Sequence, residues 1–205
     1  MSYEILISFL IASLALAFSP GPDNIFVLTQ SVVNGKKYGL ATVFGLITGC
    51  LVHTTLVAFG VSAMIKANES LFFTIKLLGA MYLVYLAYNV FVNAAAISLS
   101  VEKVSKKTTG QLFKQGFVMN VLNPKVSIFF LAFFPGFLFS QTLSTVVQFY
   151  ILGFLFMFVS LLVFSTIAIL GGAISETIRK NNKIGVYLKW MQIAVFVAIA
   201  IFILV

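Results

Sequence analysis

Long apolar runs, separated by short polar stretches, make up most of this chain of 205 residues. The runs lie approximately at residues 3–33, 39–65, 71–92, 112–139, 145–174 and 186–205. A helix needs about 20 apolar residues to cross the hydrocarbon core of a bilayer, and each run has at least this length. The pattern therefore predicts an all-α integral membrane protein with six transmembrane helices.

The composition excludes a soluble protein. The chain is 61% hydrophobic and 9% charged, whereas soluble domains carry about 25% charged residues. Its net charge of +8 could suggest nucleic-acid binding, but the basic residues lie in short clusters between the apolar runs, as topology signals do. We therefore expect one membrane domain over residues 1–205, surrounded by lipid and without a nucleic-acid partner.

The basic residues also predict which way the helices point. Most of them lie in or beside the loops after the first, third and fifth runs. These ten of the 13 Lys and Arg residues are Lys36, Lys37, Lys103, Lys106, Lys107, Lys114, Arg179, Lys180, Lys183 and Lys189. Because cytoplasmic loops are rich in Lys and Arg, we expect these loops inside the cell and both termini outside.

The chain divides into two halves that match in spacing. A stretch at about 93–111 separates a first repeat, residues 1–92, from a second, residues 112–205. Pro22-Asp23 of the first aligns with Pro124-Lys125 of the second. Three spans in each half would make the halves point in opposite directions, so we predict an inverted 3+3 repeat.

Proline motifs predict a break in the first and fourth spans. As one helix, the first run of roughly 31 residues would reach about 46 Å, against a hydrocarbon core of about 30 Å. Ser19 and Pro20 should end its first half, with Gly21 as a permissive cap and Pro22 opening a second half-helix. Asn123-Pro124 repeats the device, because Asn is a strong N-cap. No Lys or Arg precedes this first run, so we expect a retained helix and not a signal peptide.

Two opposite charges follow these prolines. Counted along the helices from the charged ends, Asp23 and Lys125 lie on the order of 15–25 Å from a surface, near the midplane. Charges at this depth indicate a functional site. We expect Asp23 to bind the ammonium group of a zwitterion and Lys125, with nearby helix N-termini, to bind its carboxylate. Asn24, Asn120 and Asn123 are further candidate ligands. In the empty protein Asp23 and Lys125 could form an ion pair; a purely structural pair is the alternative.

The residues around both motifs resemble the LysE/RhtB family of amino-acid exporters. In the first half the likeness lies in Ser19-Pro20-Gly21-Pro22-Asp23-Asn24, Gly35, Lys37, Gly39, Gly45, Gly49 and Gly79 to Leu86. In the second half it lies in Gly116, Phe117, Asn123-Pro124-Lys125, Phe129, Phe130 and Pro135. The resemblance implies a secondary exporter of amino acids or their derivatives in the bacterial inner membrane, driven by protons. The chain departs from the family pattern at Gln192-Ile193-Ala194, where a more glycine-rich turn is typical.

Other functions and residues remain open. A small cation transporter or channel using Asp23 is the alternative function. We expect no enzyme, because no nucleophile–base pair or metal motif is present, and neither a cofactor nor a metal. His53 could relay protons with Asp23 or bond a neighbouring carbonyl. Gly45 and Gly49 lie on its helix face and are expected to pack against another helix. A homodimer is also left open.

Overall fold

The computed structural model describes residues 3–67, 69–92, 107–180 and 182–204, and every regular element in these ranges is a helix. In the first half these are α1 (Tyr3–Phe18), α2 (Pro22–Asn34), α3 (Lys36–Leu56), a π-helical segment (Val57–Val61), α4 (Ser62–Ala67) and α5 (Glu69–Val92). In the second half they are α6 (Thr109–Val121), α7 (Pro124–Ile128), a π-helical segment (Phe129–Phe133), a 3₁₀ turn (Phe134–Phe137), α8 (Thr145–Ile169), α9 (Gly171–Lys180) and α10 (Asn182–Leu204). Most of the expected linker at 93–111, with Lys103 and Lys106, lies outside the described residues.

The helices have the length and composition of a multi-pass membrane protein. Among the described residues, four continuous helical stretches are long and apolar enough to span a bilayer: Lys36–Met64, Ser70–Val92, Thr145–Ile169 and Ile184–Leu204. Two further pairs pass the same test but are bent at a short break. Tyr3–Phe18 and Pro22–Asn34 meet at 57°, and Thr109–Val121 and Pro124–Phe137 at 48°. Counting each bent pair as one span gives up to six.

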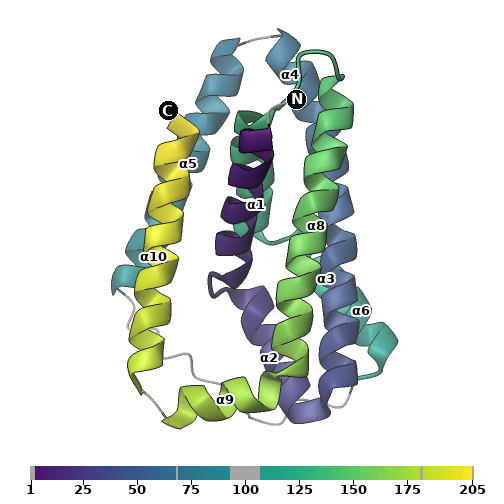
Figure 1. The fold of residues 1–205 in the computed structure, drawn as a ribbon, viewed down its shortest axis with the longest axis vertical. Helices are drawn as coiled ribbons and strands as arrows, with labels where there is room; N and C mark the ends of the chain where they lie inside the picture. Colours follow the sequence, from purple (N-terminus) through teal and green to yellow (C-terminus); the bar gives the residue numbers. More distant parts are fainter. Residues whose placement is uncertain (1–2, 68, 93–106, 181, 205) are drawn as a thin grey trace.

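The fifth run was predicted too long. The sequence pattern joined residues 145–174 into one span, but α8 ends at Ile169 and α9 begins at Gly171. Gly171 and Gly172 are poor helix formers, which favours a change of direction there. Figure 1 shows α9 lying across the lower end of the molecule, between the ends of α8 and α10. One face of α9 is buried and the other is exposed, as Ser175 and Thr177 respectively show.

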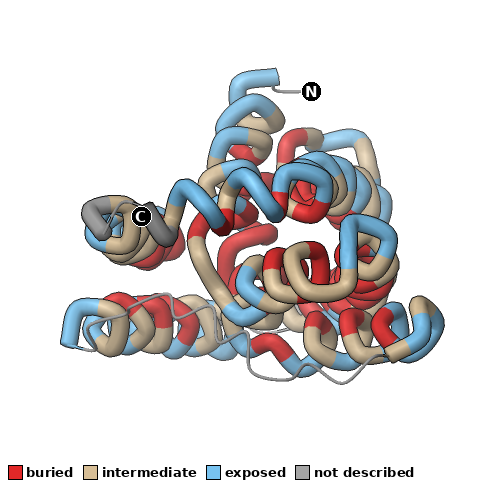
Figure 2. The backbone as a smooth tube through the Cα atoms, turned by 90° about the horizontal axis from the view of Figure 1, so that it is seen from below, coloured by how far each residue is buried: buried red, intermediate tan, exposed pale blue. Residues whose placement is uncertain are grey.

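Both termini lie at the upper end of the molecule in Figure 1, and the α2–α3 turn and α9 lie at the lower end. α3 packs against α6 and α8, and α2 against α3. α5 and α10 pack against each other and lie to one side of the other helices (Figures 1 and 2). Buried residues face the interior in Figure 2, whereas the outward faces expose large apolar side chains such as Phe73, Tyr88 and Phe154. This distribution suits contact with lipid.

Aromatic side chains fill the interior between α1, α8 and the segment that follows α7. Phe130 stacks on Phe134 with ring centroids 4.1 Å apart, and Phe9 meets the edge of Phe134 at 5.0 Å. Phe129 and Phe156 complete the group, with centroids 5.2 Å apart. These five rings form what we call the phenylalanine cluster. Its members are almost completely inaccessible to solvent, so they form part of the packed interior.

Small residues allow α3 and α6 to approach closely. A Cβ atom added at Gly45 would collide with the carbonyl oxygen of Phe113, and one added at Gly116 would collide with that of Thr42. A Cβ at Gly49 would lie 2.7 Å from Asn120 Oδ1. The packing role predicted for the glycines of this face is therefore confirmed, as small residues between membrane helices generally permit.

Replacing Gly116 should separate these helices. We expect Gly116→Ala to lower the free energy of unfolding by about 1–3 kcal/mol, because overpacking forces the backbones apart. Gly110→Ala is the matched control on the same helix, since a Cβ there meets nothing within 4 Å. The melting temperatures of both variants in detergent would check this. Equal melting temperatures would contradict the close packing of α3 on α6.

Candidate functional site

The first proline motif separates α1 from α2. The last turn of α1 closes with a bond from Ser19 N to Ala15 O of 3.0 Å, and α2 begins at Pro22. Gly21 occupies the N-cap position, but its φ of −164° is extended backbone that any residue can adopt. Gly21 also supplies no side chain to cap α2. Part of the positive N-terminal end of α2 is therefore left without a side-chain acceptor.

The second motif has its own cap. Asn123 is the N-cap of α7, and its Oδ1 accepts a bond of 3.0 Å from Lys125 N. Pro124 is the first residue of α7, where its missing N–H costs no hydrogen bond. This arrangement fixes the Asn123 side chain and leaves its amide nitrogen free to donate elsewhere.

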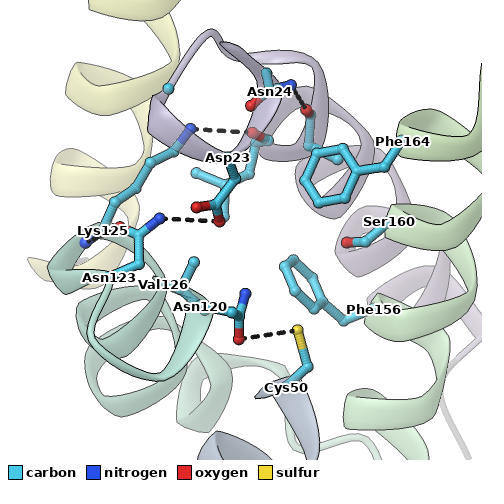
Figure 3. Close-up of a pocket in the computed structure, with 13 residues that line it drawn as sticks. Asp23, Asn24, Cys50, Asn120, Asn123, Lys125, Val126, Phe156, Ser160 and Phe164 are labelled. Atoms are coloured by element: carbon cyan, nitrogen blue, oxygen red, sulfur yellow. Dashed lines mark hydrogen bonds between the residues drawn. The ribbon is translucent and has the colours of Figure 1, made fainter. Parts of the chain in front are cut away.

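The charged residue of each proline motif is hydrogen-bonded by groups at the other break. Asn123 Nδ2 donates to Asp23 Oδ2 at 3.0 Å. Lys125 Nζ donates to Ser19 O at 2.9 Å and to Leu16 O at 3.3 Å, both at the carboxyl end of α1. Asn123 and Lys125 thus join the second half to the first through Asp23 and the end of α1, as Figure 3 shows around the cavity.

The sequence left open whether Asp23 and Lys125 form a direct ion pair, and in this structure they do not. No bond joins their charged groups among the described residues, where the contacts of Lys125 Nζ are the two carbonyls and the face of Phe196, 5.4 Å from the ring centroid. The physical reason is the break in the chain. The final carbonyls of α1 have no helical partner and carry the negative end of the helix dipole, so they attract the ammonium group.

The two motifs enclose a cavity of about 30 Å³. Its lining, drawn in Figure 3, is Leu16, Ala17, Gly21, Asp23, Asn24, Cys50, Asn120, Asn123, Lys125, Val126, Phe156, Ser160 and Phe164. Within the described part of the chain, Asp23 Oδ1 and Ser160 Oγ are buried without a hydrogen-bond partner. A buried polar atom without a partner is costly and calls for an explanation. Here it leaves a carboxylate oxygen available to a cation.

The candidate ligands predicted from the sequence all line this cavity. Asn24 Nδ2 is engaged by Ala17 O at 2.8 Å, which helps to cap α1. Asn120 accepts a long contact of 3.6 Å from Cys50 Sγ through its side chain. His53 is not part of the lining; its Nε2 lies 3.1 Å from Asn120 O, and its ring stacks on Phe130. Asn120 therefore stands between His53 and the cavity.

The sequence interpretation missed several residues of the lining. Neither Cys50 nor Ser160 was singled out as a site residue. Ser160 is one of two serines in the long apolar helix α8, where serine often bonds its own backbone, so its signal was weak. Phe156 and Phe164 are indistinguishable by sequence from the many phenylalanines that pack in the interior. No group of three or more His, Cys, Asp and Glu side chains that could hold a metal occurs in the described ranges.

Cys50 offers a direct test of the closed cavity, because it is the chain's single cysteine. It is 2% exposed. We expect a membrane-permeant maleimide to label the native protein much more slowly than the denatured protein, because the thiol becomes reachable only when the structure opens locally. The labelling rate can be followed by mass spectrometry. Equally fast labelling in both states would show that the cavity is open.

A second cavity lies next to the first and shares part of its lining. It measures about 420 Å³, and we call it the vestibule. Its lining is Pro20, Gly21, Pro22, Ile25, Tyr82, Leu86, Asn89, Val90, Asn123, Pro124, Lys125, Gln192 and Phe196. Gly21, Asn123 and Lys125 belong to both linings, so they separate the two spaces. The vestibule follows the C-terminal half of α5, which runs toward the lower end of the molecule in Figure 1.

Comparisons with known proteins give a consistent result. The family model described as LysE type translocator matches residues 14–205. The homoserine/homoserine lactone efflux protein of Salmonella typhimurium is 31% identical over 179 residues, which cover 87% of this chain and 86% of the relative. The leucine efflux protein of Salmonella choleraesuis is 29% identical over 177 residues, covering 86% and 84%. No solved structure matches the chain.

Proposed function

The chain belongs to the LysE type translocator family, and from this premise we propose that it exports a small neutral α-amino acid, or a derivative of one, across the bacterial inner membrane. The observation that carries the proposal is the buried Asp23 Oδ1, which has no hydrogen-bond partner and faces a cavity that Lys125 also lines. The printed names of the relatives, homoserine and leucine efflux proteins, support the substrate class.

The opposite charges suit a zwitterion. In this proposal the substrate ammonium binds Asp23 Oδ1, where it supplies the missing partner of a buried carboxylate. The substrate carboxylate binds Lys125 and the uncapped N-terminal end of α2. To do so, Lys125 exchanges the carbonyls of Leu16 and Ser19 for the carboxylate. The end of α1 is thereby released when substrate binds.

This exchange provides a route to alternating access. We propose that each bent pair is one broken span, and that the two halves form an inverted 3+3 repeat around a site near the midplane. Loops rich in basic residues would face the cytoplasm, with both termini outside. The vestibule would then open toward the cytoplasm, and the phenylalanine cluster would close the outer side. Release of α1 by Lys125 would allow the halves to move relative to each other.

We further propose that protons drive the cycle. A proton on Asp23 would remove the charge that holds the substrate ammonium, so protonation and substrate binding would compete at one carboxylate. His53 is the proposed relay residue, since it reaches the cavity wall through Asn120. The homodimer considered from the sequence stays a prediction.

Counterflow into proteoliposomes tests the proposed function. Vesicles with purified protein, loaded with unlabelled homoserine or leucine, should accumulate the same labelled amino acid, and an imposed proton gradient should change the rate. Vesicles without protein provide the background. The alternative, a cation pathway through Asp23, predicts ion flux in the absence of any amino acid. Ion flux without counterflow would therefore overturn the exporter and favour the cation pathway.

A further inference from the structure

We propose that the vestibule binds the side chain of the exported amino acid and selects a neutral side chain ending in a hydroxyl group. The inference rests on the proposed function. It concerns the substrate side chain, which the cavity around Asp23 is too small to hold. It also assigns a role to residues of α5 and α10, which lie outside both proline motifs.

The sizes of the two spaces divide a substrate into parts. A cavity must offer about 10–15 Å³ to hold one water molecule, so the 30 Å³ beside Asp23 has room for a group such as an ammonium and little more. The vestibule, at about 420 Å³, falls within the range of about 300–1,000 Å³ typical of small-molecule sites. Because Lys125 lines both spaces, a substrate carboxylate on Lys125 places the side chain in the vestibule.

The chemistry of the vestibule is mostly apolar with a few polar groups. Leu86, Val90 and Phe196 form part of its apolar wall, and Asn89 and Gln192 bring two amide groups to it from facing helices. In the described structure neither amide side chain donates to or accepts from another residue. Both amides line the vestibule and neither is used in an internal hydrogen bond, so we assign them to a ligand.

An amide both donates and accepts, and a hydroxyl does the same, so the two groups are complementary. Tyr82 adds a phenolic hydroxyl to the lining. The charged residue of the lining is Lys125, and the substrate carboxylate occupies it. An ionised side chain would therefore be buried without a counter-ion, which is strongly unfavourable. The vestibule accordingly favours neutral side chains, and among these it favours a hydroxyl over a methyl group.

α5 and α10 also contact each other close to these amides. Lys189, one turn before Gln192, donates from Nζ to Phe91 O of α5 at 2.7 Å. Phe91 also meets the ring of Trp190, with centroids 6.1 Å apart. Asn89 and Gln192 therefore reach the vestibule from two helices that pack against each other.

The test compares homoserine with norvaline, which carries a methyl group in place of the hydroxyl. Counterflow of each labelled compound is measured in proteoliposomes with wild-type protein and with the double variant Asn89→Leu/Gln192→Met. Wild-type protein should prefer homoserine. In the double variant the homoserine rate should fall roughly five- to tenfold relative to the norvaline rate, as the loss of one or two neutral hydrogen bonds predicts.

Tyr82→Phe is the second variant, and Tyr85→Phe is its matched control. Tyr85 is on the same helix and 55% exposed, and it does not line the vestibule. Tyr82→Phe removes a single oxygen atom and should shift the preference in the same direction, by a smaller factor. It also keeps the test decisive if the double variant does not fold.

The outcomes separate this inference from the function it rests on. Suppose that wild-type protein exchanges both compounds. If the homoserine-to-norvaline rate ratio is then the same in Tyr82→Phe and in the folded double variant, the vestibule does not select the side chain, whereas the exporter function stands. A parallel fall in both rates likewise overturns selection by these amides. If wild-type protein exchanges neither homoserine, leucine nor norvaline, the proposed function fails, and the inference fails with it.

Discussion

Asp23→Asn should reduce amino-acid counterflow on the order of 100-fold, because a hydrogen bond to a charged group contributes about 1.5–3 kcal/mol and each 1.4 kcal/mol is a factor of ten. The substitution preserves size and shape. An asparagine oxygen at this position can still accept the bond that Asn123 Nδ2 makes at 3.0 Å, so the contact between the halves remains. The charge that would bind the substrate ammonium is lost. Counterflow of labelled homoserine and leucine into proteoliposomes measures the effect.

Glu4→Gln is the matched control for this prediction. It removes the same charge from the exposed first turn of α1, far from the cavity in sequence, and should leave counterflow unchanged. Melting temperatures of both variants should stay close to that of the wild type. Counterflow at the wild-type rate in Asp23→Asn vesicles would remove Asp23 from the substrate site.

Lys125→Met should abolish counterflow and also lower the melting temperature. Methionine has a similar length but donates no hydrogen bond, so the carbonyls of Leu16 and Ser19 lose the ammonium that now binds them. A buried acceptor left without a partner costs about 1–3 kcal/mol, which sets the expected loss of stability. The transport defect has a separate cause, since the substrate carboxylate would lose its cationic partner.

Lys189→Met is a close control, because Lys189 also donates to a backbone carbonyl and lies over a phenylalanine ring. Its Nζ is 2.7 Å from Phe91 O and 5.6 Å from the centroid of the Phe91 ring. This variant should melt at a lower temperature but retain most of its transport, because Lys189 lines neither cavity. If Lys125→Met behaves in the same way, Lys125 is a structural cap of α1 and does not bind substrate.

Local physical chemistry explains the parts of the fold that could be predicted. The apolar runs are as long as the bilayer requires, and the six expected runs correspond to the long helices and bent pairs of the structure. α2 begins at Pro22 and α7 at Pro124, since proline fixes its own φ and lacks an N–H. The sequence placed the end of the fifth span at residue 174, whereas α8 ends at Ile169. Residues 170–174 carry no charge, and hydropathy alone does not detect a turn between two helices.

The candidate site was predictable as a set of residues but not as a set of contacts. Asp23, Asn24, Asn120, Asn123 and Lys125 could be identified because they are charged or amide residues at or beside the two proline breaks. Their partners could not. Attraction between opposite charges suggested an ion pair, whereas the chain break in α1 offers Lys125 two free carbonyls instead. Ser160 and Asn89 were not singled out, and Gln192 was noted only as a departure from the family pattern, because a polar residue in a long apolar helix does not reveal what it faces.

The sequence by itself determined that this is a multi-pass helical membrane protein of the LysE type, and where two of its helices begin. These properties depend on the length of apolar runs, on proline geometry and on short motifs, all of which are local. Only the tertiary structure decided that Asn123 binds Asp23, that Lys125 caps α1, and that α5 and α10 bring two amides to the vestibule. Helices that are apolar on every side carry no stripe that fixes their rotation, so close packing of glycines, aromatic rings and buried polar groups determines which residues meet.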